Sequence, residues 1–385
     1  MRRALLFGLI AALLALTAWW SWPRPGERSG NGFSLQGLLG GEAGEYARAE
    51  SARPFEFPAD HGPHPDFRSE WWYVTGNLSG EAGERYGFQF TLFRFAMTPR
   101  ERPSRSDWGT RQAYMAHLAL TDVATGRSYA FERFSRGAAG LAGAQAQPFA
   151  VWLDDWRLAE GETPFPWLLQ AAEQEVELRL RLAPDKPPVL QGEQGLSRKG
   201  PEPGNASYYY SYTRMSADGE LRLGDRRVSV RGSAWLDREW STSALSPDLA
   251  GWDWFALQFD DGSELMLYQL RRGDGGSSPF SAATYVPAAG APRHLDARDF
   301  RLTALDHWQS PKTGTRYPAG WRVEIPALEA ELTVAATVPD QELNLSVRYW
   351  EGAVDVDGRL LGKPARGVGY MELTGYGGGQ AVRAR

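Results

Sequence analysis

The chain has no cysteine and only five histidines among its 385 residues. Without cysteine, neither disulfides nor lipid attachment to an N-terminal cysteine is available, so the fold has to rest on its own hydrophobic core. Blocks of one charge are missing too: 42 Lys and Arg are interspersed with 47 Asp and Glu, for a formal net charge of −5. This mixed pattern makes nucleic acid and anionic lipid surfaces poor partners.

The signatures of several large enzyme classes are also absent. The sequence contains no G-x-S-x-G elbow, no Walker loop and no dinucleotide-binding fingerprint. We therefore predict no cofactor. What the chain has in quantity is aromatic residues, with 16 Trp, 15 Tyr and 17 Phe. Such side chains line pockets for apolar ligands, and they also simply fill wide β-barrels.

An apolar run opens the chain. Arg2 and Arg3 precede residues 4–22, and three tryptophans lie at the far end of that run. The run is close to the roughly 20 residues that span a bilayer, and its flanks follow the positive-inside and aromatic-belt patterns. The sequence predicts a signal peptide or an uncleaved inner-membrane anchor at 1–24 and a spacer at 25–53. The rest of the chain would then lie on the periplasmic or extracellular side.

The remaining residues show the short apolar or alternating stretches typical of strands, separated by turn signals that suit hairpins. The predicted strands are 71–78, 86–95, 114–122, 175–182, 208–215, 227–235, 252–259, 264–270, 321–325, 330–336, 343–350 and 368–373. A weak repeat, in which FRSEWWYVTGNL is echoed by LDREWSTSAL, divides them into two halves. We predict an all-β protein with two tandem antiparallel β-barrels, at 54–225 and 226–385. The segment 184–207 is too long for a hairpin turn and is either functional or disordered.

The stretch DHGPHPDFRSEWWY, at 60–73, is the first concentration of chemically active side chains. His61 and His64 have H-x-x-H spacing, but the intervening prolines disfavour a helix and no further metal ligands are visible, so we predict no metal site. A catalytic or ligand-gating role and a loop that plugs the barrel remain open. If 70–73 is extended, Glu70 and Trp72 share one face, and Glu70 is either a proton donor beside Trp72 or the partner of an arginine such as Arg94.

The stretch SAWLDREWS, at 233–241, is the second concentration of chemically active side chains. In an extended strand Trp235, Asp237 and Glu239 fall on one face, and Arg238 falls on the other. Two carboxyl groups beside a tryptophan can share a proton. Adding or removing water needs one acid to protonate the substrate and one carboxylate or histidine to activate water. The alternative is a ladder of salt bridges with Arg238. We expect the stretches 60–73 and 233–241 to meet near one pocket.

Two further strands carry aromatic faces. Tyr210 belongs to a tyrosine-rich face of 207–215, and Trp254 lies in GWDWFALQF, at 251–259. Such faces bind polyenes or acyl chains and stabilise carbocations, or they fill a core. His117 lies in mid-strand, where a buried core histidine and a catalytic base are both consistent with the sequence.

Taken together, FPADHGPHPDFRSEWWYVTGNL, GNASYYYSYTR, SAWLDREWSTS and GWDWFALQFDDG resemble the AttH- and CrtC-like family of exported proteins, which are related to the acyclic-carotenoid 1,2-hydratases and often labelled secreted hydrolases. The resemblance covers nearly all of the chain beyond residue 53. It implies two lipocalin-like, calycin-type barrels and association with an ABC-type export system that handles lipophilic cargo.

Two functions follow as expectations. As an enzyme, the protein would carry out hydratase or hydrolase chemistry on an isoprenoid or lipid-like ligand, with Asp237, Glu239 or Glu70 as proton donor and His61 or His117 as base. As a carrier, it would hold the same ligand without reaction. In both cases the residues expected to contact the ligand are aromatic: Trp72, Tyr73, Tyr210, Trp235, Trp254 and Tyr268.

Overall fold

The computed structural model describes residues 44–100, 106–243, 246 and 248–377, all within one compact unit. The predicted apolar segment at 1–24 and most of the spacer at 25–53 lie outside the described residues. Apart from two single turns of 3-10 helix, Ala59–His61 and Pro326–Leu328, the described residues form strands and loops. None of their helices is long and apolar enough to cross a membrane.

Strands β1–β13 form the first sheet, in which every pairing is antiparallel. Its strands are β1 (Ser69–Gly80), β2 (Arg85–Ala96), β3 (Gln112–Asp122), β4 (Arg127–Arg136), β5 (Ala142–Ala146), β6 (Phe149–Leu153), β7 (Trp156–Glu160), β8 (Trp167–Glu173), β9 (Val176–Pro184), β10 (Val189–Leu190), β11 (Leu196–Arg198), β12 (Ala206–Leu223) and β13 (Arg226–Ser241).

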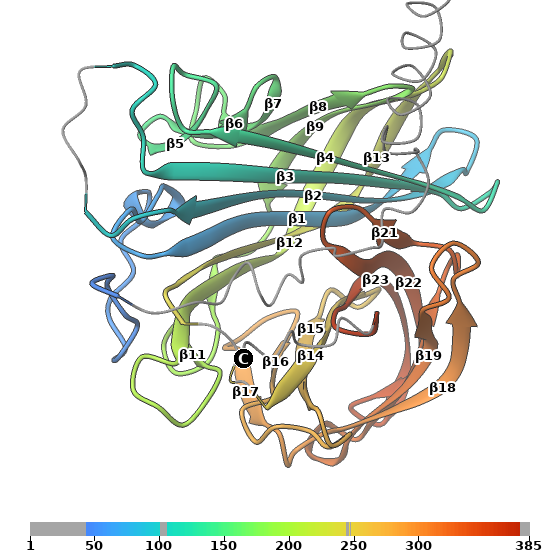
Figure 1. Ribbon diagram of the computed structural model, residues 1–385. Helices are drawn as coiled ribbons and strands as arrows, with labels where there is room; N and C mark the ends of the chain where they lie inside the picture. The colour runs from blue at the N-terminus through green and yellow to red at the C-terminus, as the bar shows by residue number, and fades with distance from the viewer. Residues whose placement is uncertain (1–43, 101–105, 244–245, 247, 378–385) are drawn as a thin grey trace, which may run out of the picture. The chain divides into compact units, whose positions relative to one another are not determined.

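Strands β14–β23 form the second sheet, also antiparallel. Its strands are β14 (Leu249–Phe259), β15 (Glu264–Arg272), β16 (Ala282–Val286), β17 (Arg293–Asp296), β18 (Arg301–Gln309), β19 (Arg316–Ile325), β20 (Ala330–Ala336), β21 (Glu342–Asn344), β22 (Arg348–Leu360) and β23 (Lys363–Leu373). Each sheet curls into a barrel-like structure (Figure 1). The predicted all-β, antiparallel class is therefore confirmed.

The two sheets share one strand order. In the first, β1 pairs with β2 on one side and with the last strand, β13, on the other. In the second, β14 pairs with β15 on one side and with the last strand, β23, on the other. Each sheet encloses its own hydrophobic core, because one large cluster of buried side chains comes almost wholly from strands of the first sheet and another wholly from the second.

Burial along the strands shows where the sheets meet. The outlying strands β9 and β20 alternate between buried and exposed residues, as expected when one face is solvated. In β1, β2 and β3 most residues are buried, and they follow one another without the alternation seen in β9 and β20. Both faces of these strands are covered, one by their own barrel core and the other by the second sheet.

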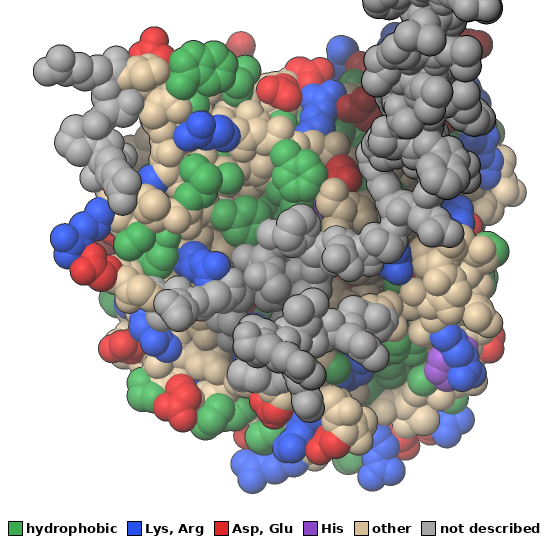
Figure 2. All heavy atoms as spheres, viewed as in Figure 1, with side chains coloured by type: hydrophobic (Ala, Val, Ile, Leu, Met, Phe, Trp, Pro, Cys, Tyr) green, Lys and Arg blue, Asp and Glu red, His purple; other side chains and the backbone are tan. Residues whose placement is uncertain are grey.

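Mixed clusters of aromatic and aliphatic side chains fill the contact between the sheets. The backbones approach closely there: a Cβ added to Gly87 of β2 would lie 2.6 Å from the Cβ of Ala353 of β22. Polar groups also cross the contact. Glu264 of β15 pairs with Lys186 at 2.8 Å and with Arg214 at 2.7 Å. On the face shown in Figure 2, basic side chains are interspersed with acidic ones.

The boundary between the halves differs from the sequence expectation. We placed it between residues 225 and 226, but β13 is a central strand of the first sheet, and the second sheet begins at Leu249. The proposed repeat was also misaligned. Its two Glu-Trp pairs are cross-strand neighbours within one sheet, with Glu70 opposite Trp240 and Trp71 opposite Glu239. The strand order shows instead that β14 corresponds to β1.

Candidate functional site

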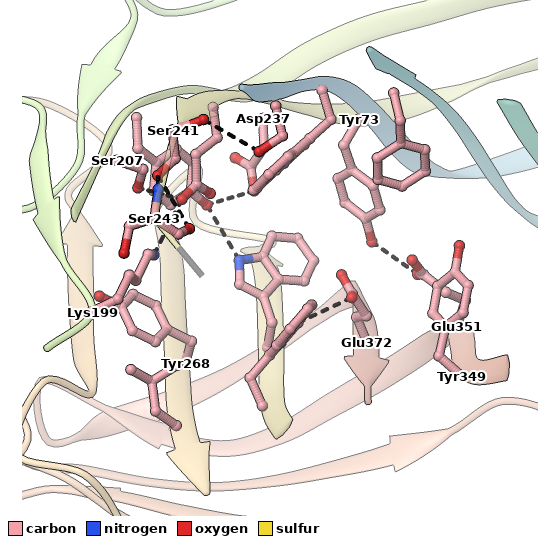
Figure 3. Close-up of a pocket in the computed structure, with 18 residues that line it drawn as sticks. Tyr73, Lys199, Ser207, Asp237, Ser241, Ser243, Tyr268, Tyr349, Glu351 and Glu372 are labelled. Atoms are coloured by element: carbon pink, nitrogen blue, oxygen red, sulfur yellow. Dashed lines mark hydrogen bonds and ion pairs between the residues drawn. The ribbon is translucent and has the colours of Figure 1, made fainter. Parts of the chain in front are cut away.

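A pocket lies between the outer faces of the two sheets (Figure 3). The space not filled by atoms there is about 950 Å³, part of which is open solvent. Strands β1, β12 and β13 supply one wall, and β14, β15, β22 and β23 supply the other. Its apolar lining is mostly aromatic: Trp71, Tyr73, Phe93, Tyr209, Trp252, Trp254, Tyr268, Leu270 and Tyr349. The pocket therefore offers flat apolar walls to a ligand that would touch both sheets.

Strand alternation determines which side chains reach the pocket. Along β13, Asp237, Glu239 and Ser241 face it, and their partners on β1 are Tyr73, Trp71 and Ser69. The intervening residues of both strands point into the core of the first sheet. This confirms the predicted face of Asp237 and Glu239.

Asp237 is buried and held by three donors. Ser211 Oγ donates to one carboxyl oxygen at 2.5 Å, as does Trp235 Nε1 at 2.7 Å, and Tyr209 Oη donates to the other at 2.5 Å. Burial raises the pKa of Asp237 to about 7, with the neighbouring charge of Glu239 acting in the same direction and the three hydrogen bonds against it. Both protonation states of Asp237 are therefore populated near neutral pH.

Glu239 has a different environment. Ser207 Oγ donates to its carboxylate, and the ammonium of Lys199 lies 3.3 Å from it. Lys199 also lies over the ring of Tyr268, 4.5 Å from its centroid. Burial by itself would lower the pKa of Lys199, but the charge of Glu239 reverses this and raises it. Lys199 is thus held as a cation at one end of the pocket.

Glu351 and Glu372 lie at the other end, on neighbouring strands and directly opposite each other in the register (Figure 3). Glu351 accepts a hydrogen bond from Tyr73 Oη at 2.9 Å, and Glu372 accepts one from Trp252 Nε1 at 3.0 Å. Burial raises the pKa of both carboxyl groups, that of Glu372 to about 8. The charge of Glu372 adds to the rise at Glu351, and the charges of Asp237 and Glu239 add to the rise at Glu372.

Glu70 does not line the pocket. It is fully buried on the opposite face of β1, where it pairs with Arg94 and Arg238. Burial alone would raise the pKa of Glu70, but the two guanidinium groups outweigh it and hold this pKa well below the usual range. The interpretation of Glu70 as a proton donor is therefore corrected to the alternative of an arginine-paired carboxylate.

His61 lies inside the first barrel, away from the pocket, with Nδ1 2.6 Å from Tyr210 Oη and its backbone oxygen accepting from Trp72 Nε1 at 2.8 Å. Burial lowers the pKa of His61 to about 4. Trp72 and Tyr210 belong to the same core. Trp72 and Tyr210 were expected to contact a ligand and His61 to act as a base, but none of the three lines the pocket between the sheets.

His117 lies between the sheets, behind one wall of the pocket. Its Nδ1 is 2.6 Å from the hydroxyl of Tyr349, while Nε2 has no partner among the described residues. Burial lowers the pKa of His117 to about 3, so its ring is neutral. His117 can act on a ligand only through Tyr349.

The two stretches 60–73 and 233–241 were expected to meet near one pocket, and some of their residues do line it. The pocket brings together five of the residues proposed from sequence, namely Tyr73, Asp237, Glu239, Trp254 and Tyr268. Trp235 lies just behind them, bonded to Asp237. Three charged groups were missed: Lys199, Glu351 and Glu372. The length of the segment 184–207 was the one signal for Lys199, whereas the sequence around the two glutamates resembles an ordinary strand.

His61 and His64 do not converge on a shared point. His64 instead stacks on Trp240, with ring centroids 3.8 Å apart, and bonds to Asp60 and Glu70. Across the described part of the chain, no group of three or more His, Cys, Asp or Glu side chains could hold a metal ion.

Similarity to known proteins identifies the family of this chain. A model of the AttH-like family matches residues 48–376. The chain belongs to the AttH-like family. A crystal structure of a protein described as AttH, from Nitrosomonas europaea, is 37% identical and superposes with a TM-score of 0.76, covering 86% of this chain and 99% of that one.

Two more distant proteins of known name are similar. The dehydratase asqC of Emericella nidulans is 25% identical over 200 residues, which span 49% of this chain and 55% of asqC. The chain therefore matches about half the length of this curated relative. Kievitone hydratase from Nectria haematococca is 14% identical, with a TM-score of 0.66 over 86% of this chain and 96% of its own, and shares the fold.

Proposed function

We propose that this AttH-like protein adds water to, or removes it from, an apolar ligand held between the two sheets. The observation that carries the proposal is Asp237, a buried carboxyl group with a pKa raised to about 7 in an aromatic pocket. A general acid works best when its pKa is near the working pH. Relatives named as a dehydratase and a hydratase support the same reaction class.

The pocket residues suggest a balanced sequence of steps for hydration. Asp237 donates its proton to one carbon of an alkene, which leaves a cation on the other carbon. The surrounding rings stabilise that cation through their π-faces. Water then bonds to the cationic carbon and loses a proton to a carboxylate, either Asp237 itself or Glu239, two residues further along the same face. Dehydration is the reverse, with Asp237 protonating the departing hydroxyl group.

The isosteric substitution Asp237→Asn tests this proposal. It retains the shape of the side chain but removes the transferable proton, so we expect turnover to fall by about 10² to 10⁴-fold while ligand affinity changes little. Turnover is followed as the gain or loss of one water by mass spectrometry, in ligand recovered from organic extracts. Glu342→Gln is the control, because Glu342 is buried in the second sheet and bonds to Ser310, outside the pocket. Unchanged turnover in Asp237→Asn would contradict the proposal.

One observation favours a second candidate, a carrier that binds the same ligand without reaction. Both oxygens of Asp237 already accept hydrogen bonds from the protein, from Ser211, Tyr209 and Trp235. In a carrier, an acid satisfied in this way holds the pocket walls together and transfers no proton. In that case Asp237→Asn leaves the bound ligand chemically unchanged, as in the wild type.

We further propose that each sheet is a lipocalin-like barrel, that the ligand is lipid- or isoprenoid-like, and that the protein is exported. The shared strand order supports the first point and the aromatic lining the second. Residues 4–22 would anchor the chain in the inner membrane, where an ABC-type permease is a candidate partner. Deletion of residues 1–24 should move the protein from the membrane pellet to the supernatant, and retention of the shortened protein in the pellet at high salt would contradict the anchor.

A further inference from the structure

One acidic side chain in the pocket differs from the other buried acids in its partners. Nine Asp and Glu residues are buried in the described part of the chain. Six of them pair with an arginine or lysine: Asp60, Glu70, Asp122, Glu239, Asp253 and Glu264. The other three are Asp237, Glu342 and Glu351.

Hydrogen bonds account for two of these three. Asp237 accepts three, as described above, and Glu342 accepts from Ser310, Thr313 and Tyr317 at 2.5–3.0 Å. Glu351 accepts only one, from Tyr73, on a single oxygen. Its Oε1 has no hydrogen-bond partner among the described residues, although the side chain is only 1% exposed. A buried polar atom in this state is costly unless something else occupies the space beside it.

The surroundings of Glu351 indicate what that occupant is. Glu372 lies directly across from it, so two carboxyl groups share this end of the pocket without a cation. Lys199 is at the opposite end, bound to Glu239 (Figure 3). The adjoining walls are the rings of Tyr73, Trp252 and Tyr349 and their neighbours. Acid pairs beside aromatic faces recognise organic cations, because the carboxylates supply charge and the rings supply their quadrupoles.

We propose that Glu351 and Glu372 form a subsite for an organic cation, a protonated amine or quaternary ammonium group carried by the ligand. The inference rests on the proposed function in that the same pocket holds the ligand, but it does not depend on the reaction. Burial favours the protonated form of both acids, and the charge of Glu372 adds to this at Glu351. When the cation enters, a carboxyl proton leaves to solvent and the resulting carboxylate faces the cation.

Two probes of the same shape test the subsite, phenyltrimethylammonium and its neutral isostere tert-butylbenzene. In calorimetric titrations of the full chain near pH 8, phenyltrimethylammonium should bind at least about tenfold more tightly than tert-butylbenzene. The affinity for the cation should rise between about pH 6 and about pH 8. Because one proton is released on binding, the rise can reach about tenfold per pH unit. The affinity for the neutral probe should not rise. Heats measured in buffers of different ionisation enthalpy count the released proton.

The double variant Glu351→Gln/Glu372→Gln retains acceptors for Tyr73 and Trp252, so its fold should survive. We expect it to weaken binding of the cation by about 30-fold or more and to leave tert-butylbenzene binding unchanged. Glu342→Gln removes a buried carboxyl group outside the pocket and should change the affinity for neither probe.

Equal affinity for the two probes, or unchanged cation binding by the double variant, overturns the subsite and leaves the hydration proposal standing. If binding is specific for the cation but turnover is unchanged in Asp237→Asn, the subsite is supported and the proposed reaction is rejected. If the double variant does not fold, the pH dependence of the wild-type protein decides the matter, because affinity for the cation that does not rise with pH overturns the proposal.

Discussion

Burial and hydrogen bonding act in opposite directions on the pKa of Asp237, and their balance brings this pKa close to neutral pH. Three donors favour its carboxylate, whereas the apolar walls favour its acid form. At Glu70, also fully buried, two guanidinium groups change the outcome and the carboxylate is strongly preferred. Residue type and burial alone therefore do not distinguish a proton donor from a structural ion. The identity of the neighbours decides.

For the two buried histidines that we first considered as bases, the same reasoning yields an expectation. Burial lowers the pKa of His61 to about 4 and that of His117 to about 3, so both rings should stay neutral at pH values where free histidine is half protonated. Two-dimensional nitrogen-proton NMR of the imidazole rings measures this directly. A midpoint near the ordinary value for either ring would contradict the burial described here.

Sequence reasoning placed single residues well where one strand was enough to decide. The alternation of 233–241 correctly put Asp237 and Glu239 on one face and Arg238 on the other. It could not find Glu351 or Glu372, because their role arises from pairing between β22 and β23 and from the sheet packed against them. Lys199 was missed for a similar reason: its partner, Glu239, is 40 positions away and on another element.

At the scale of elements, the buried central strands and the regularly alternating β9 and β20 were predicted, whereas several short or exposed strands were missed. Strands β1, β2 and β3 are buried on both faces and therefore read as apolar runs. Strand β18 is mostly exposed, and β5 to β7 are five residues each, so neither has a distinctive pattern. The proposed repeat failed because similar letters in β1 and β13 reflect pairing within one sheet.

Substitutions on the two faces of the β1 and β13 pair should reduce stability by very different amounts. Glu70→Gln leaves Arg94 and Arg238 buried without their counterion, which we expect to cost about 3–5 kcal/mol of unfolding free energy. Asp237→Asn, on the other face, removes a carboxyl group that has no cation, so its cost at pH 8 should be much smaller. Urea unfolding of both variants in the same buffer makes the comparison. Equal losses would mean that the two faces are not distinguished in this way.

At the scale of the whole molecule, the raised pKa values should make stability depend on pH. Asp237 and Glu372 have folded pKa values of about 7 and about 8, above their usual values of 3.8 and 4.5. Between about pH 6.5 and pH 8 the folded state therefore binds more protons than the unfolded state, and stability falls as pH rises. His61 and His117 oppose this only near pH 6.5, where each is about half protonated in the unfolded state and neutral in the folded state; as pH rises further they become neutral in both states.

Chemical denaturation of the ligand-free protein at several pH values across this window measures the slope. Each group contributes at most about 1.4 kcal/mol per pH unit. Glu372→Gln should flatten the curve, whereas Glu342→Gln should not. A stability that rises from pH 6.5 to pH 8 would contradict the raised pKa values on which the acid chemistry rests.

The position of the pocket outside both barrels has a consequence for how such a protein can diversify. Each barrel interior is already filled by its own core, so the residues that fill the barrels are not those that line the pocket. Substitutions on the facing strands can therefore change what is recognised while leaving each scaffold intact. The same architecture can supply a lineage with new specificities through a small number of wall residues, without the loss of folding that usually accompanies changes inside a barrel.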